Sequence, residues 1–437
     1  MSAFSVFFTQ CPSFLDFQER MQKKHNKNNA QSIFGVHQLP STSQISNLLD
    51  PIPPETLYPV LADVGDQLYQ NGWLESFRSI NNTLLVALDG TDSVSSEKIS
   101  CPCCTQQLLK NGKTLFRHIV ITPVIVAPGQ KQVIPLPLEF VQAQDGHEKQ
   151  DCELAAAKRW LTNWGAHYAE RRVTILGDDL YCHQPFCQAI MAQAIDFLLF
   201  CKPDSHSLLY EWVADFERIG QVQTLNITRW TGKKHLTEHY RFVKQVPLRD
   251  SDDALHVNWC EVTISDDAQK VIYRNAWVTT HDITTENVQI IVAACRARWK
   301  IKNENNNVLK NHGYHFEHNF SHGKKYLANL LATLNVLAFL LHTAMSYLDE
   351  IYRKTRTSLP SRRTFFEQVR TLLQLIPFDN WEHFIMFMLD GQEIIPVKTC
   401  GFKLGIAGYI GLVLCGISRH FLAVPWQTTC QDSHIRN

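Results

Sequence analysis

The chain lacks a net charge of either sign, because its 437 residues carry 42 Lys and Arg against 42 Asp and Glu. The overall balance therefore does not point to a class of partner. Its 13 cysteines follow no regular spacing, which argues against a disulfide framework. The N-terminus lacks a basic region followed by an apolar core, so the sequence predicts no secretory signal peptide and a place in the reducing cytoplasm.

Long charge-free runs are also scarce. Residues 326–348 contain no Asp, Glu, Lys or Arg and are long enough to cross a bilayer. However, Asn329, Asn335 and His342 interrupt this run, so we expect a buried core helix and no membrane partner. A second apolar stretch, residues 404–418, is short for a span and lacks helical periodicity.

The order of apolar runs indicates an α/β protein with several segments, which a chain of this length allows. Residues 1–80 are expected to be helical, and residues 81–204 alternate strands with helices. Residues 205–280 hold short runs rich in β-branched and aromatic residues, which are typical of an antiparallel β insertion. Helices resume over 281–350, and residues 351–437 hold a basic linker at 353–363, a helix near 364–376 and an apolar tail.

The segment 81–204 is where we expect the centre of a sheet, because its runs are the most apolar. The predicted strands are residues 84–88, 116–126, 133–137, 173–176 and 197–201, and the predicted helices are 151–171 and 184–195.

Two aspartates follow apolar strands of this segment. Asp89 comes after residues 84–88, and Asp178 comes after residues 173–176. If both strands lie in one sheet, both carboxylates project from its C-terminal edge, where open α/β sheets bind ligands. Two such carboxylates can hold divalent metal for phosphoryl transfer. The alternatives are an Asx turn at Asp89, and Asp179 in place of Asp178, because neighbouring strand residues point to opposite faces.

The basic stretch over residues 295–310 is the third element, and we expect a helix there. With about 100° per residue, Arg298 and Lys302 lie on one side of this helix. Glu304 lies about 200° from Lys302 and therefore faces another side. A π-bulge in the Asn-rich stretch around 303–307 is one device that would shift the helical phase.

These elements, in this order, resemble the bacterial insertion-sequence transposases of the DDE type, in the group whose ribonuclease H-like core contains a β-strand insertion. The strand followed by Asp89-Gly-Thr resembles the first catalytic block, and Gly177-Asp-Asp-Leu-Tyr resembles the second. The resemblance covers roughly residues 1–350. The family signature Tyr-x2-Arg-x3-Glu-x6-Lys falls, in order, on Cys295, Arg298, Lys302 and, one residue late, Lys310.

The resemblance implies a ribonuclease H-like core, a mixed sheet with flanking helices, which the antiparallel insertion interrupts and which helical N- and C-terminal regions extend. It implies a bacterial, nucleoid-associated enzyme of DNA transposition and recombination. Such an enzyme binds double-stranded element ends, assembles as a homodimer on DNA, and cuts and joins strands. DNA contacts are expected from residues 1–80 and from Arg296, Arg298, Lys302, Lys310, Lys233 and Lys234.

The family holds two Mg²⁺ ions, which Mn²⁺ can replace, between two aspartates and a glutamate. Asp89 and Asp178 match this set, but the position of the signature glutamate is Lys302. Glu304 is then the expected third ligand, provided that the helix is distorted enough to aim it. One alternative is a disabled transposase that only binds DNA, and a weaker one is a zinc nuclease unrelated to transposition.

A separate motif, Cys101-Pro-Cys-Cys104, contains the CxxC half-site of a structural Zn²⁺ site. His118 is the first candidate to complete it, and His147 and Cys152 are further candidates. A reduced thiol loop without metal is the alternative. The histidines that follow the basic stretch are expected to be capping, packing or DNA-facing residues; they are His312, His315, His318 and His322.

Overall fold

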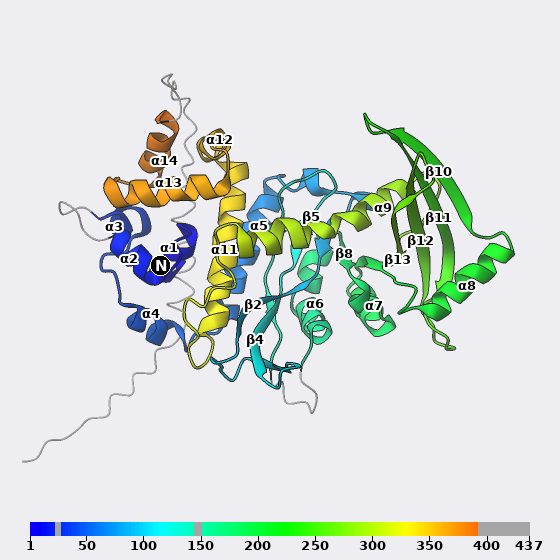
Figure 1. Cartoon of the computed structure of the whole chain (residues 1–437), viewed down its shortest axis with the longest axis horizontal. Helices are drawn as coiled ribbons and strands as arrows, with labels where there is room; N and C mark the ends of the chain where they lie inside the picture. The colour runs from blue at the N-terminus through cyan, green and yellow to red at the C-terminus, as the bar shows by residue number, and fades with distance from the viewer. Residues whose placement is uncertain (22–27, 144–150, 392–437) are drawn as a thin grey trace, which may run out of the picture.

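The computed structural model describes residues 1–21, 28–143 and 151–391, and a mixed sheet of nine strands runs through the molecule (Figure 1). The strand order is β10-β11-β12-β13-β9-β8-β1-β5-β6. The bounds of the five strands on one side are β1 Leu84–Ala87, β5 Val124–Val126, β6 Ile134–Pro135, β8 Val173–Gly177 and β9 Asp196–Phe200. The other four are β10 Gln223–Trp230, β11 His235–Pro247, β12 His256–Asp266 and β13 Val271–Thr279. The predicted α/β class is therefore confirmed.

The centre of this sheet is formed by β1 and β8, which run parallel in the register Leu84↔Val173 to Ala87↔Leu176. Every residue of both strands is buried, as expected of parallel strands that are covered on both faces. β9 continues the parallel set next to β8, whereas β5 pairs with β1 antiparallel and β6 pairs with β5 antiparallel. The prediction that strands 84–88 and 173–176 share one sheet is confirmed.

The predicted strand over residues 116–126 is wrong, because two strands in different sheets occupy it. β4 (Thr114–Ile121) lies in a second sheet with β2 (Gly90–Ser96), β3 (Thr105–Leu108) and β7 (Glu139–Phe140), and β5 lies in the large sheet. The chain changes sheets at Pro123, which has no N–H to donate to a ladder. Since β2 begins at Gly90, a strand takes the place of the Asx turn that was the alternative at Asp89.

The segment 205–280 begins with a helix that the sequence patterns did not reveal, α8 (Ser207–Arg218). Its four strands follow as antiparallel neighbours, and β13 pairs with β9. The predicted insertion therefore extends the large sheet instead of forming a separate layer. Figure 1 shows β10–β13 and α8 together at one end of the molecule.

Helices flank the sheet, and some of them begin near the strand ends. They are α6 Glu153–Ala169, α7 Gln184–Met191 and α9 Val288–Ala297, followed by a π-helical turn at Ile301–Asn306 and α10 Asn307–Asn311. The 3₁₀ turns are Pro54–Leu57, Glu75–Phe77, Ile80–Asn82 and Asp179–Tyr181.

The long apolar run forms the helix α11 (Leu327–Leu348), whose apolar stretch is entirely buried. Within the described residues it is the one helix whose length and composition would suit a membrane. Its polar side chains have partners inside the fold: Asn335 donates to the carbonyl of Tyr314 at 2.7 Å, and His342 Nδ1 lies 2.7 Å from the Tyr314 hydroxyl. The burial and these contacts fit the expected core helix.

The remaining helices gather around α11 at the opposite end from β10–β13 (Figure 1). N- and C-terminal segments meet there, because Asn29 donates to the carbonyls of Leu373 and Ile376 and accepts from the N–H of Phe378. The expected linker at 353–363 is wrong, since a helix covers much of it; the predicted tail at 404–418 lies outside the described residues. These helices are α1 Ser2–Phe8, α2 Phe14–Arg20, α3 Asn29–Phe34, α4 Thr42–Leu49, α5 Tyr58–Gln70, α12 Glu350–Ser358, α13 Arg362–Leu375 and α14 Trp381–Asp390.

Candidate functional site

The C-terminal ends of β1 and β8 bring Asp89 and Asp178 to neighbouring positions on one sheet edge. The ladder continues past the strands, since the N–H of Leu88 donates to Leu176 O at 2.8 Å. Asp178 Oδ1 accepts from the N–H of Leu180 and so caps a 3₁₀ turn. Asp179 is held elsewhere, by the N–H of Lys202 at 2.7 Å and by the Ser205 hydroxyl at 2.5 Å. Of the two candidates, Asp178 faces Asp89, and its charge adds to the rise in the pKa of Asp89.

A third carboxylate that the sequence reasoning missed lies in this site. Glu153 is the first residue of α6, and its Oε1 accepts from the N–H of Gly90 at 2.8 Å and from the Tyr181 hydroxyl at 2.6 Å. A Cβ at Gly90 would lie 2.5 Å from Glu153 Cδ, so only glycine fits there without displacing the carboxylate. The sequence gives no separate signal for this contact, because an acidic residue in the first turn of a helix is common for electrostatic reasons.

Three side chains spaced four residues apart approach Asp89 from the segment after α9. Lys302 Nζ lies 3.4 Å from Asp89 Oδ1, and an Arg298 guanidinium nitrogen lies 3.9 Å from the same oxygen. Asn306 donates from Nδ2 to Asp89 Oδ2 at 3.3 Å. The i→i+5 bonding of a π-helical turn widens the turn beyond the α-helical 3.6 residues. Residues four apart therefore stay closer to one face, which keeps both Lys302 and Asn306 directed at Asp89.

Glu304 is on the same π-helical turn and is partly exposed. The charged groups that act most on Asp89 are Lys302, Glu153, Arg298 and Asp178. The helix is thus distorted where the sequence suggested, but the side chains that contact Asp89 from this turn are Lys302 and Asn306. A metal-binding role for Glu304 stays a prediction.

Burial dominates the electrostatics of Asp89, which is 6% exposed. Removal from water raises the pKa of Asp89 to about 6, while the nearby cation Lys302 opposes the shift and Glu153 adds to it. At neutral pH the Asp89 carboxylate is therefore mostly ionised and forms an ion pair with Lys302.

The present arrangement places a cation where a Mg²⁺ ion would bind beside Asp89. The three carboxylates also do not form one compact ligand group, since they are not among the two groups of described His, Cys, Asp or Glu side chains whose ligand atoms all lie within 4.8 Å of one another. Mg²⁺ requires its oxygen ligands at about 2.0–2.1 Å. The Lys302 ammonium occupies the position beside Asp89 that such an ion would occupy, and it already balances the charge of that carboxylate.

The predicted DNA-binding residues lie in three different environments. Lys233 and Lys234 are exposed in the turn between β10 and β11, and Arg296 is exposed with its guanidinium 4.8 Å from the centre of the Tyr273 ring. Lys310 forms an ion pair with Glu317 at 2.6 Å. Lys302 and the buried Arg298 face Asp89 instead, as described above.

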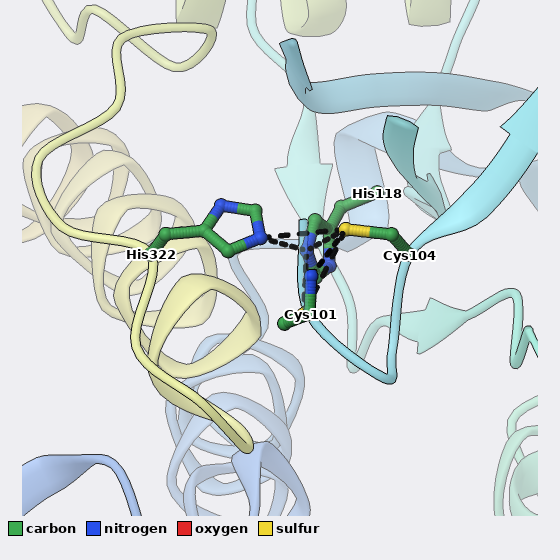
Figure 2. A group of neighbouring side chains, drawn as sticks. All are labelled: Cys101, Cys104, His118 and His322. Carbon is green, nitrogen blue, oxygen red and sulfur yellow. Dashed lines mark hydrogen bonds between the residues drawn. The ribbon is translucent and has the colours of Figure 1, made fainter. Parts of the chain in front are cut away.

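Four Cys and His side chains converge at a second place, shown in Figure 2. Cys101 and Cys104 lie between β2 and β3, His118 is on β4, and His322 comes from the segment that leads into α11. Their ligand atoms all lie within 4.8 Å of one another, and Cys104, His118 and His322 are buried. The predicted trio Cys101, Cys104 and His118 is thus brought together, in an arrangement compatible with a structural metal.

The fourth member of this cluster is His322, whose role the sequence did not reveal. Its sequence neighbours differ: His318, for example, packs its ring against Phe320. Of the other candidates, His147 lies outside the described residues, and Cys152 is exposed at the start of α6. A second group of buried side chains, Cys182, Cys201 and His206, also has ligand atoms within 4.8 Å of one another.

Comparison with known proteins adds no identity, since no protein-family model and no curated protein matches the chain.

Proposed function

We propose that this chain descends from DDE-type insertion-sequence transposases, still binds double-stranded DNA, and no longer cuts or joins strands. The observation that carries the proposal is the position of Lys302, whose ammonium lies 3.4 Å from Asp89 Oδ1. In the family, a carboxylate is expected at that signature position, so a cation takes the place of a metal ligand.

The fold supports this descent. The proposal includes a ribonuclease H-like core, because a mixed sheet with flanking helices carries the two aspartates on adjacent parallel strands. The antiparallel strands β10–β13 join the sheet between the second and third blocks of the resemblance, where the family has its β insertion.

The balance of charge explains why the chemistry is lost. Asp89, Asp178 and Glu153 supply three negative charges, and Lys302 with Arg298 already supplies two positive charges beside Asp89. Two-metal phosphoryl transfer needs carboxylates that can hold two divalent cations about 4 Å apart. An ammonium beside the buried carboxylate opposes those cations through like-charge repulsion, which is weakened but not removed by the partial exposure of Lys302.

DNA binding does not depend on that metal chemistry. Lys233, Lys234 and Arg296 are exposed and can contact DNA phosphates. Such contacts release counterions from the DNA, and this release supplies much of the binding free energy. Three other basic side chains of strands β10 and β11 form ion pairs within the fold. Arg229 pairs with Glu238, Arg241 with Glu217 and Glu261, and Lys244 with Asp282.

A second candidate function, an active transposase, has one specific observation in its favour. The negative charge of Glu153 adds to the rise in the pKa of Asp89, and the Glu153 carboxylate accepts a hydrogen bond from the N–H of the neighbouring residue Gly90. If Lys302 moved to a DNA phosphate, Glu153 would be the third carboxylate of the site, and activity would depend on it.

The experiment compares nicking of DNA that carries the sequences flanking the gene, with Mg²⁺ or Mn²⁺, by the native chain, Lys302→Glu and Lys302→Glu/Asp89→Asn. We expect all three to bind DNA with an affinity that falls with salt, and only Lys302→Glu to nick it. Nicking by the native chain that Asp89→Asn and Glu153→Gln both abolish would overturn the proposal in favour of the active enzyme. Absence of DNA binding by the native chain would overturn both.

A further inference from the structure

We propose that Cys101, Cys104, His118 and His322 bind one structural Zn²⁺ in a tetrahedral site that ties the loop between β2 and β3 to the start of α11. The proposal is independent of DNA binding and of the strand-end carboxylates, because it rests on a different set of side chains from different elements.

The distances within the cluster match tetrahedral zinc. With Zn–S near 2.3 Å and Zn–N near 2.0–2.1 Å, a tetrahedron requires about 3.8 Å between sulfurs, about 3.5 Å between sulfur and nitrogen, and about 3.3 Å between nitrogens. The two sulfurs are 3.7 Å apart, and the two Nε2 atoms are 3.4 Å apart. The sulfur–nitrogen distances are 3.4 Å for Cys101–His118, 3.2 Å for Cys104–His118 and 3.3 Å for Cys104–His322.

Neither a disulfide nor a network of hydrogen bonds accounts for the cluster as well as a metal ion does. A disulfide between Cys101 and Cys104 needs sulfurs about 2.05 Å apart, whereas they are 3.7 Å apart as free thiols. Hydrogen bonds alone also fail, because His118 Nε2 faces two sulfurs and the Nε2 of His322 at once. One ring nitrogen carries at most one hydrogen and cannot satisfy three neighbours. A single cation satisfies all four ligand atoms together.

The surroundings prepare His118 to be a ligand through Nε2. Its Nδ1 lies 2.6 Å from Asn329 Oδ1, and because a carbonyl oxygen only accepts, Nδ1 must carry the hydrogen. Nε2 of the neutral ring then presents its lone pair to the centre of the cluster. Such an outer hydrogen bond is the usual way in which proteins orient a metal-binding histidine. The backbone N–H of Cys101 also points at Cys104 Sγ, at 3.3 Å.

The same motif contains its own control. Cys103 lies between the two cysteine ligands in the sequence, and its thiol donates to the carbonyl of Lys325 at 3.2 Å. Its sulfur also contacts the Cys101 thiol, but it is not one of the four ligand atoms that all lie within 4.8 Å of one another. Cys103 therefore shares the loop and the solvent conditions of the cluster without being one of its four ligands.

The site joins parts of the chain that are far apart in sequence. His322 lies 218 residues after Cys104, and its segment is held from the other side by the N-terminal region. Asp50 accepts from the N–H groups of Lys324 and Lys325, and Ser46 bonds to Ser321 at 2.9 Å. Zinc would thus fix the four-stranded sheet against the segment between α10 and α11, which also contacts the C-terminal part of α4.

The test measures the zinc content of the purified full-length chain and of two ligand variants, Cys104→Ser and His322→Asn. We expect each ligand variant to lose one equivalent of zinc, and the matched controls Cys103→Ser and His318→Asn to lose none. The readout is the difference from the native chain, because the group around Cys182 has its own capacity for metal. Equal zinc in native chain and ligand variants, or equal loss in Cys103→Ser, would overturn the proposal.

X-ray absorption of Cys182→Ser, in which the second Cys/His group can no longer supply two sulfurs, tests the ligand set even if the ligand variants fail to fold. Loaded with one equivalent of Zn²⁺, Cys182→Ser should show two sulfur neighbours near 2.3 Å and two nitrogen neighbours near 2.0–2.1 Å. Substitution by Co²⁺ should give the visible bands of a tetrahedral thiolate site. Fewer than two sulfur neighbours, or an octahedral Co²⁺ spectrum, would contradict the assignment.

Discussion

Lys302 lowers the pKa of Asp89, in opposition to the burial that raises it to about 6. Replacing Lys302 by Met removes this cation while keeping much of the side-chain volume, so the pKa of Asp89 should rise above about 6. The measurement is a titration of the Asp89 carboxyl carbon by NMR in the native chain and in Lys302→Met. An Asp89 pKa that stays the same or falls in the variant would mean that Lys302 is not close enough to act on it.

Asp89 also makes the stability of the fold depend on pH. Its folded pKa of about 6 lies above its ordinary value of 3.8, so between these values the folded state holds a proton that the unfolded state has released. The free energy of unfolding therefore decreases as the pH rises from about 4 to about 6, by at most about 3 kcal/mol from this group.

We expect Asp89→Asn to lack this contribution, since an amide does not titrate. Urea unfolding at several pH values should show the variant gaining stability relative to the native chain as the pH rises through that window. A constant difference between the two proteins from pH 4 to pH 7 would contradict the assignment of the raised pKa to Asp89.

At the scale of single elements, the start of α6 is fastened to the strand ends through Glu153. The Tyr181 hydroxyl is fully buried and donates to Glu153 Oε1 at 2.6 Å. Glu153→Ala leaves that hydroxyl and the N–H of Gly90 without a partner and should cost about 1–3 kcal/mol or more. Glu153→Gln keeps an acceptor oxygen and should cost less, as measured by chemical denaturation.

A second substitution tests the close approach in that contact. Gly90→Ala would place a Cβ 2.5 Å from the Glu153 carboxylate and should destabilise the native chain. The same substitution should have a much smaller effect in the Glu153→Ala background, because the obstructing group is gone. Equal effects in both backgrounds would show that Glu153 does not lie against Gly90.

Whether a strand or turn could be predicted depended on how clearly its own residues indicate it. β1 and β8 were predictable because buried parallel strands are continuous apolar runs. The division of residues 116–126 was not, since the apolar end of β4 and the apolar strand β5 follow each other closely and the chain changes sheets between them. The place of the π-helical turn at Ile301–Asn306 was suggested by the Asn-rich stretch, but a helical projection of the sequence does not show that the turn would direct Lys302 and Asn306 at Asp89.

At the scale of the whole molecule, the same limit applies to both sites. Asp89, Asp178 and the CxxC motif are visible in the sequence because each lies in a short recognisable context. Glu153 and His322 complete their sites from distant positions, and only the packing of α6 and of the segment before α11 brings them in. In the sequence alone, Glu153 is one acidic residue and His322 one histidine among many, and nothing near either of them indicates its contacts in the fold.

Zinc should also contribute to the stability of the whole fold, because it joins the four-stranded sheet to the helical end of the molecule. Removal of metal by a chelator should lower the melting temperature of the native chain by at least roughly 5 °C. Cys103→Ser should respond in the same way, whereas Cys104→Ser should melt at a lower temperature that the chelator no longer changes. A native chain whose melting temperature ignores the chelator would contradict a structural role for the metal.

The central claim is that Lys302 keeps divalent metal from the carboxylates at the strand ends. Its most direct test is calorimetric titration of Mn²⁺ into the zinc-loaded native chain, Lys302→Glu and Lys302→Glu/Asp89→Asn. The account predicts no saturable Mn²⁺ binding in the native chain, clear binding in Lys302→Glu, and its loss again when Asp89 is replaced. Saturable binding in the native chain that Asp89→Asn removes would contradict the account and make the strand-end site a working metal centre.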